Sequence, residues 1–255
     1  MNAMLIDIGN TALKWAWADS PAAPQTVVHV GLADLRPALR ERWAGLAPHR
    51  VLACSVASDL VVHAVADALA GCRIEWQRAQ ARFEGPFTLV NGYREPLALG
   101  TDRWHAAIGA ASLHPGEALL VVHVGTATTV DSVVPEPDGS LRFAGGRIAP
   151  GPVLMRDSLA RGTARLPHAS GVRVDFPDNT MDAISTGVLD AQAGLVERAA
   201  RAMRAAGHPP RLLLAGGAAQ EIAPLLLPEF ERAEVEHNLV LRGLALRAEH
   251  SLKKP

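Results

Sequence analysis

Cysteine is scarce in this sequence, and its scarcity argues against two classes of protein. The 255 residues include two cysteines, Cys54 and Cys72. Two are too few for a disulfide framework, and their spacing is not that of a metal site. Both lie near predicted core segments, so we interpret them as buried, unreactive thiols. We therefore expect a fold that is held together by its apolar core.

The sequence also lacks a basic excess and a long apolar run. The formal net charge is -1, which is not the electrostatic footprint of a nucleic-acid-binding protein. No stretch reaches the roughly 18–20 consecutive apolar residues of a membrane span, and no signal-peptide pattern is present. Because 49% of the residues are hydrophobic, a sizeable core can form. These features predict a soluble, cytoplasmic protein without a nucleic-acid or membrane partner.

Short apolar strands alternate with amphipathic helices along the chain. The pattern predicts strands at 4–8, 12–19, 50–56 and 118–124, and helices at 101–114, 180–206 and 239–250. The stretch 73–99 is rich in glycine, proline and aromatic residues and has no clear period. Hairpins beside crossover helices indicate an α/β fold with mixed sheets flanked by helices.

Two segments of the chain are built alike. "LIDIGNTALKWAW" begins at Leu5 and "VVHVGTATTVDSV" begins at Val121, about half a chain length later. Each has an apolar strand with a polar residue, then a spacer, a glycine, small polar residues and a second strand. The similarity indicates a duplicated domain, and we expect an N-terminal domain at 1–115 and a C-terminal domain at 116–255.

The two turns have the composition of a phosphate site. Gly9 and Gly125 allow close backbone approach, and the amides and hydroxyls that follow can donate hydrogen bonds to phosphate oxygens. Lys14 adds a cation, and Asp7 is a candidate Mg²⁺ ligand, since Mg²⁺ prefers one or two carboxylates plus phosphates. The alternative is a pair of tight hairpins whose polar residues only satisfy the turns.

The segment "GTDRWHAAIGA" places Asp102 and Arg103 at the start of a predicted helix. There Asp102 can complement the helix dipole, or it can accept a proton from an alcohol during phosphoryl transfer. "AGGRIAPG" at 144–151 is either a substrate loop or a tight corner. In "NTMDAISTG", Asn179 or Thr180 can cap a helix. "LLLAGGAA" at 212–219 can let a nucleotide approach the backbone.

Six segments, taken together, resemble the type III pantothenate kinases, in the family's order and over most of the chain. The segments are "DIGNTALK", "GTDR", "VGTATT", "GGRIAPG", "NTMDAISTG" and "LLLAGG". That family belongs to the acetate kinase/sugar kinase/Hsp70/actin superfamily. The resemblance implies duplicated actin-like (ribonuclease H-like) domains and a homodimer with the pantothenate pocket at the subunit interface. It also implies ATP-dependent phosphorylation of pantothenate to 4′-phosphopantothenate, the first step of coenzyme A biosynthesis.

The resemblance also assigns roles to single residues. Asp102 matches the general base that deprotonates the pantothenate hydroxyl. ATP, bound with Mg²⁺, is assigned to Asp7, Ile8, Gly9, Asn10, Thr11, Ala12, Leu13, Lys14 and Thr126. Pantothenate is assigned to Tyr93, Gly100, Thr101, Asp102, Arg103 and Thr180.

One position departs from the family pattern. His123 stands where the family usually has an acidic residue associated with a bound monovalent cation, K⁺ or NH₄⁺. A neutral imidazole does not replace a carboxylate toward a hard cation, so the hypothesis is weaker K⁺ dependence or a cation held elsewhere. The alternative to an enzyme is a non-catalytic regulatory protein of the same family. The presence of Asp7, Lys14 and Asp102 favours the enzyme.

Overall fold

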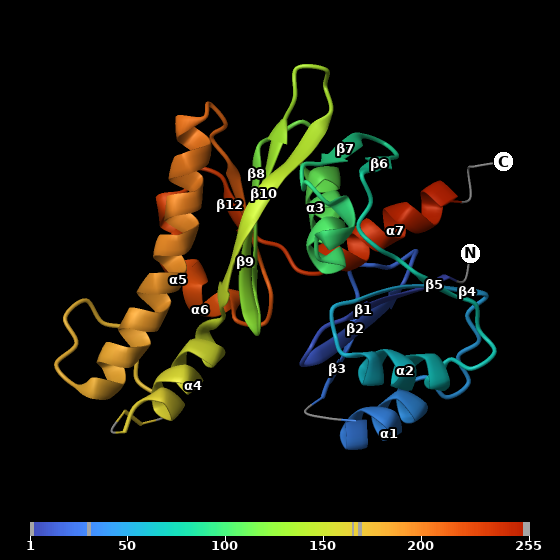
Figure 1. The fold of residues 1–255 in the computed structure, drawn as a ribbon, viewed down its shortest axis with the longest axis horizontal. Coiled ribbons are helices and arrows are strands. Elements are labelled where there is room, and N and C mark those ends of the chain that lie inside the picture. The colour runs from blue at the N-terminus through green and yellow to red at the C-terminus, as the bar shows by residue number, and fades with distance from the viewer. Residues whose placement is uncertain (1–2, 30–31, 165, 168–169, 252–255) are drawn as a thin grey trace. The chain divides into compact units, whose positions relative to one another are not determined.

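A computed structural model describes residues 3–29, 32–164, 166–167 and 170–251 of the chain (Figure 1). The chain divides into two compact units. The first contains Met1–Pro115, Pro137–Phe143 and Asn238–Pro255, and the second contains Gly116–Glu136 and Ala144–His237. The first boundary between the units lies after Pro115, where the sequence places the domain boundary. The C-terminal segment, however, groups with the first unit, so the units are not the two continuous domains expected from the sequence. Each unit is described below by itself.

The first unit is built on a five-stranded sheet in the order β3-β2-β1-β4-β5. The strands are β1 (Ala3–Ile8), β2 (Ala12–Trp17), β3 (Gln25–Val28), β4 (Arg50–Ser55) and β5 (Ile74–Trp76). β1, β2 and β3 pair antiparallel, whereas β4 runs parallel to β1 and β5 parallel to β4. Helices α1 (Leu32–Arg42) and α2 (Asp59–Ala68) share an apolar cluster with β1 through Ile6 and Ile8. Because strand side chains alternate, Asp7 lies on the opposite face.

On that opposite face, helices α3 (Thr101–Leu113) and α7 (Leu239–Ser251) pack against each other (Figure 1). Two glycines make the close crossing: a Cβ at Gly109 would collide with the carbonyl of Leu239, and a Cβ at Gly243 with the carbonyl of His105. α7 also contacts β1 and β4. This packing explains why the C-terminal helix belongs to the first unit.

The stretch 73–99, which has no clear period in the sequence, contains short elements in addition to β5. They are β6 (Arg82–Glu84), β7 (Thr88–Asn91) and the 3-10 helix η1 (Pro96–Ala98). β6 and β7 pair antiparallel, and β7 pairs in parallel with the first residues of β10 (Leu141–Pro150). Strands of three or four residues are too short for a periodic signal, so the sequence pattern missed them.

The second unit repeats the strand pattern of the first. Its order is β12-β11-β8-β9-β10, with β8 (Leu119–Val124) and β9 (Ala127–Pro135) forming the antiparallel hairpin. β11 (Arg211–Ala215) runs parallel to β8, and β12 (Ala233–Val235) parallel to β11. The matching strand order in the two units agrees with the predicted duplication.

The helices of the second unit are α4 (Pro152–Gly162), α5 (Thr180–Ala205), α6 (Ala219–Leu226) and the 3-10 helix η2 (Leu227–Glu229). α5 and α6 form the core with β8, through residues such as Val122, Val196 and Ile222. Within the described ranges of the chain, no helix has both the length and the hydropathy needed to cross a bilayer.

Candidate active site

The first hairpin turn, between β1 and β2, is fixed by hydrogen bonds that leave its tip exposed. The amide of Gly9 donates to the carbonyl of Ala12 at 3.0 Å. His29, which is buried, approaches the turn twice: its Nε2 lies 3.3 Å from the Gly9 carbonyl, and its amide donates to the Thr11 carbonyl at 3.0 Å. Asn10 and Thr11 are exposed at the tip. The turn therefore presents an ordered backbone with donor groups, which suits a phosphate.

Asp7 lies in a row of side chains that crosses the sheet. Its register partners are Lys14 on β2 and Cys54 on β4, so all three side chains share one face. The Cys54 thiol donates to Asp7 Oδ1 at 3.7 Å. Burial raises the pKa of the Cys54 thiol well above its usual value, so this cysteine is a neutral donor and not a nucleophile. The sequence interpretation of both cysteines as buried thiols agrees with this for Cys54, whereas Cys72 is only partly buried.

The environment of Asp7 makes its negative charge costly. Its pKa is raised to about 7, first by burial and then by the nearby carboxylate of Asp102, against the lowering effects of Lys14 and Cys54. Helix α3 contacts β4, the strand that carries Cys54 next to Asp7, so the first unit places α3 close to this row of side chains. A carboxylate of this kind gains from a divalent cation and its phosphates, because the cation neutralises the charge.

Asp102 and its neighbours begin helix α3. Gly100 precedes the helix, and a Cβ there would stand 2.7 Å from Asp102 Oδ1, so a side chain at this position would crowd the carboxylate. Thr101 donates its hydroxyl to the Gln77 carbonyl at 3.0 Å, so its side chain serves the fold. His105 Nδ1 donates to the Thr101 carbonyl at 2.7 Å. The pKa of this fully buried imidazole is lowered to about 4, chiefly by burial, so His105 is neutral at physiological pH.

Arg103 is buried and held by aromatic residues. Its Nη1 donates to the Tyr93 hydroxyl at 2.8 Å, and its guanidinium carbon lies 5.7 Å from the ring centres of both Tyr93 and Phe143. Tyr93 and Phe143 meet edge to face at 5.9 Å. A guanidinium that is largely removed from water and fixed in orientation can recognise a carboxylate with well-defined geometry.

The second hairpin turn, in the second unit, is enclosed by glycines. The Gly125 amide donates to the Ala127 carbonyl at 3.0 Å, and the Gly151 amide donates to the Thr126 carbonyl at 2.9 Å. A Cβ at Gly151 would collide with the Gly125 carbonyl, and one at Gly216 with the backbone of Val124. The glycine-rich segments 144–151 and 212–219 therefore both support this turn, and Thr126 is exposed on it.

The remaining predicted residues of the second unit are His123 and Thr180. His123 lies on β8 in register with Thr129, on the face opposite Val122 and Val124. Thr180 is exposed at the start of α5, where the cap is Asn179, whose Oδ1 accepts the amide of Asp182 at 3.0 Å. Thr180 is therefore not needed as the cap. It borders an apolar hollow of about 410 Å³, lined also by Met155, Leu159, Leu166, Ala183, Ile184, Gly187 and Val188.

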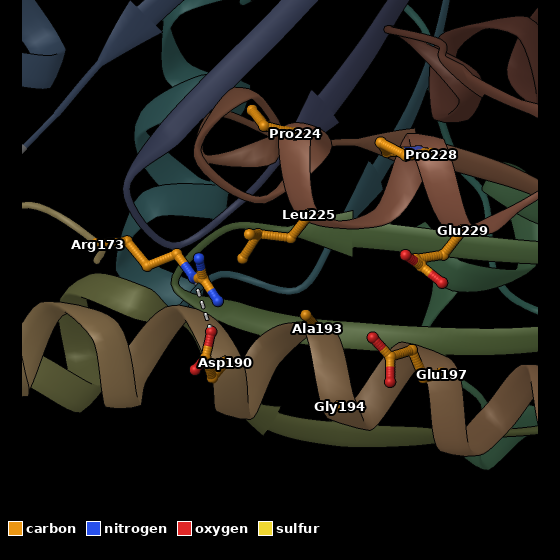
Figure 2. A pocket seen from close by; sticks show the side chains of 9 residues that line it. All are labelled: Arg173, Asp190, Ala193, Gly194, Glu197, Pro224, Leu225, Pro228 and Glu229. Carbon is orange, nitrogen blue, oxygen red and sulfur yellow. Dashed lines mark hydrogen bonds and ion pairs between the residues drawn. The ribbon is translucent and has the colours of Figure 1, made fainter. Parts of the chain in front are cut away.

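A larger hollow of about 490 Å³ lies elsewhere on the second unit, between α5 and the α6–η2 segment (Figure 2). Arg173 at the edge of the hollow is paired with Asp190 at 3.0 Å. Glu197 lines the hollow from α5, and Glu229 lines it from η2. Two further acidic groups do not suit a polyphosphate. None of the residues predicted for the site lines this hollow, so size alone does not identify the active site.

A metal in this protein has few ligands available. The described ranges contain no group of three or more histidine, cysteine, aspartate or glutamate side chains arranged around a common point. Asp7 remains the candidate carboxylate, which fits Mg²⁺ bound by one or two carboxylates together with phosphates. His123 offers a nitrogen ligand, so it does not fit a hard monovalent cation.

Comparison with known proteins identifies the family. The model of the family described as type III pantothenate kinase matches residues 3–202. The chain belongs to the type III pantothenate kinase family. It is 43% identical to the type III pantothenate kinase of Cupriavidus taiwanensis, over 96% of this chain and 97% of that protein. It is 42% identical to that of Laribacter hongkongensis, over 95% and 96%. The predicted family and kinase activity are confirmed.

Solved structures support the fold. A Campylobacter jejuni protein assigned to the Baf family of transcriptional activators aligns with a TM-score of 0.61 at 21% identity, over 97% of this chain and 99% of that one. A Sinorhizobium meliloti protein assigned as a 2-dehydro-3-deoxygalactonokinase aligns with a TM-score of 0.59 at 13% identity, over 99% and 100%. These likenesses concern the fold alone, and they confirm the predicted duplicated actin-like α/β architecture.

Proposed function

We propose that this chain transfers the γ-phosphoryl group of ATP to the hydroxyl of pantothenate, forming 4′-phosphopantothenate at the start of coenzyme A biosynthesis. The observation that carries the assignment of the site is the placement of Asp7 beside Lys14 and Cys54 on the sheet face that α3 and α7 cover. Asp7 ends a strand at a phosphate-type turn, and Asp102 begins a helix beside the Arg103–Tyr93 pair. Phosphoryl transfer needs both groups near each other, because donor and acceptor must meet in line.

The proposed ATP contacts are residues 7–14 and Thr126. In the turn between β1 and β2, backbone amides and the Thr11 side chain donate to phosphate oxygens, and Lys14 offsets their charge. Asp7 is the proposed Mg²⁺ ligand. When bound, Mg²⁺ supplies positive charge to the phosphates and to this half-buried carboxylate.

The proposed acceptor contacts are Tyr93, residues 100–103 and Thr180. Asp102 accepts the proton of the pantothenate hydroxyl as the oxygen attacks phosphorus, which makes it the proposed general base. Arg103, held by two aromatic rings, pairs with the pantothenate carboxylate. Thr101 contributes through its backbone, since its hydroxyl already bonds Gln77.

The activity assay also tests this assignment. ADP release would be measured from ATP and Mg²⁺ in the cytoplasmic pH range, with pantothenate added or omitted. Release that depends on pantothenate and saturates with it is expected. ADP release at a rate that does not depend on pantothenate, or no release at all, would contradict the proposed acceptor. The same results would reopen the regulatory alternative, which no feature of the structure favours.

A K⁺ titration tests the departure at His123. We propose that turnover depends only weakly on K⁺ or NH₄⁺, because His123 lacks the oxygen ligand that a hard cation prefers. Turnover at saturating substrates would be followed while K⁺ replaces a large organic cation at constant ionic strength. A change of less than about twofold is expected, since a lost ligand set should leave no specific response. Strong, saturable activation would refute it.

A further inference from the structure

One buried amide holds the segment that leads to Tyr93. Asn91, the last residue of β7, is only 7% exposed. Its Nδ2 donates to the Gln80 carbonyl at 3.0 Å and to the Pro96 carbonyl at 3.1 Å. Its Oδ1 accepts the Tyr93 amide at 3.1 Å. Three of the four hydrogen-bonding positions of the amide are therefore used. Two of the bonds go to the segment 92–99, and the third goes to the chain before β6.

Two of these bonds anchor the segment 92–99, one near its beginning and one at its middle. The Tyr93 bond fixes its beginning, and the Pro96 bond fixes the start of η1, one turn before Gly100 and α3. Gly92 adds a backbone bond, donating to the Phe143 carbonyl at 2.9 Å. Tyr93 is thus held at its amide by Asn91 and at its hydroxyl by Arg103.

We propose that Asn91 is a positioning residue for the acceptor substrate. It sets the place of Tyr93 and, through the Tyr93 hydroxyl, the orientation of the Arg103 guanidinium. This inference rests on the proposed function, because it takes pantothenate as the acceptor that Tyr93 and Arg103 contact. An ordered loop does not have to be fixed at the moment of binding, so its anchor contributes directly to affinity.

The turn between β1 and β2, which we propose contacts ATP, has a separate buried anchor that serves as a control for Asn91. His29, 4% exposed, holds the Gly9 carbonyl through its side chain and the Thr11 carbonyl through its backbone amide. The two substrate loops in the first unit are therefore held by different residues, and each residue contributes at least one side-chain contact. Loosening one loop should weaken the binding of one substrate and leave the binding of the other unchanged.

The test compares Asn91→Asp, Asn91→Ala and His29→Ala in the full chain by steady-state kinetics. Asn91→Asp keeps the acceptor for the Tyr93 amide, but it places an oxygen against the carbonyls of Gln80 and Pro96. We expect both Asn91 variants to raise the KM for pantothenate by roughly 10–100-fold, the effect of the two hydrogen bonds lost in Asn91→Asp and the three lost in Asn91→Ala. The KM for ATP should stay within about twofold, whereas His29→Ala should show the reverse pattern.

A purely structural role gives a different result. Asn91 variants that lose thermal stability or active fraction, with both KM values unchanged, would overturn the inference, as would a parallel rise in both KM values. If the unaltered protein turns over ATP without any response to pantothenate, the proposed function fails and the inference falls with it. The unaltered protein therefore separates the two failures.

Discussion

At the scale of single residues, the proposed chemistry depends on two carboxylates in unlike surroundings. Asp7 is held between Lys14 and Cys54 on a sheet face, and burial moves its pKa to about 7. Asp102 stands at a helix start behind a glycine that leaves room for it. Environments that differ in this way let two residues of one type perform different tasks. Here the proposed tasks are metal binding and proton transfer.

Asp102→Asn tests the proton-transfer role. The amide is isosteric but cannot accept the hydroxyl proton, so we expect kcat to fall by roughly 10²–10⁴-fold. The KM for ATP should change little, because the proposed ATP contacts are elsewhere. Initial rates and a thermal melt would be measured together. Turnover near that of the unaltered protein would remove Asp102 from the role of base.

His105 makes the stability of the first unit depend on pH. Its pKa is about 4 in the folded state and about 6.5 in the unfolded chain, so the unfolded chain binds more protons between these values. The stability that it contributes is complete above pH 6.5 and declines as pH falls toward 4. The positive charge of Arg247 lowers the pKa of His105 as well, in the same direction as burial.

We expect the unfolding free energy to drop by about 2 kcal/mol more between pH 7 and pH 5 in the unaltered protein than in His105→Asn. Asn can still donate to the Thr101 carbonyl. Asp7 acts in the opposite direction, because its raised pKa favours the folded state at low pH, but it is common to both proteins and cancels. Urea titrations at the two pH values would measure this. Equal losses in the two proteins would contradict it.

At the scale of elements, the crossing of α3 and α7 decides where the C-terminus belongs. The sequence of α3 is rich in small residues, among them Ala106, Gly109 and Ala110, which allow tight helix packing. The partner helix lies well over 100 residues away, and no local pattern identifies it. Gly109 and Gly243 are needed because backbone meets backbone at this crossing. The sequence therefore predicts that α3 packs closely but not on what.

Gly243→Ala tests this crossing. The added methyl would meet the His105 carbonyl, so we expect a loss of roughly 1–3 kcal/mol of unfolding free energy from overpacking. Gly194→Ala is the matched control, because a Cβ at this exposed position on α5 meets nothing within 4 Å. It should raise stability by roughly 0.5–1 kcal/mol, through helix propensity. Similar effects of both substitutions would contradict the packing argument.

Much of the candidate site was predictable from the sequence because it lies in turns and helix starts with distinctive residues. The charge of Asp7 at the end of an apolar strand, and "GTDR" at a helix start, are local patterns. The sequence did not indicate Asn91 or His29, since a single Asn or His belongs to no recognisable motif. Nothing local shows that Asn91 makes three buried hydrogen bonds or that His29 contacts the turn between β1 and β2. Such anchors depend on contacts between segments that only the fold brings together.

At the scale of the whole molecule, the homodimer implied by the family remains a proposal. The second unit exposes apolar side chains near Thr180: Phe176 is 94% exposed and Val172 is 64% exposed. Thr180 itself borders the apolar hollow described above. A second copy of the chain is the occupant that we propose, because the resemblance to the family implies a pantothenate pocket at a subunit interface.

Phe176→Asp should convert the dimer to a monomer. Nothing in the core is lost, because the ring is almost fully exposed, while a charge at the interface is costly. Light scattering after size exclusion would measure the mass, with Leu60→Asp, an exposed site on α2 of the first unit, as the control. A monomeric unaltered protein, or a dimer that survives Phe176→Asp, would contradict the proposed surface.

The most direct test of the central claim is the identity of the product. ATP, Mg²⁺ and pantothenate would be incubated with the protein, and the product would be followed by phosphorus NMR. The account predicts a new phosphomonoester signal coupled to the methylene protons next to the pantothenate hydroxyl, formed in step with ADP. Inorganic phosphate alone, or a phosphate ester on a different molecule, would contradict it.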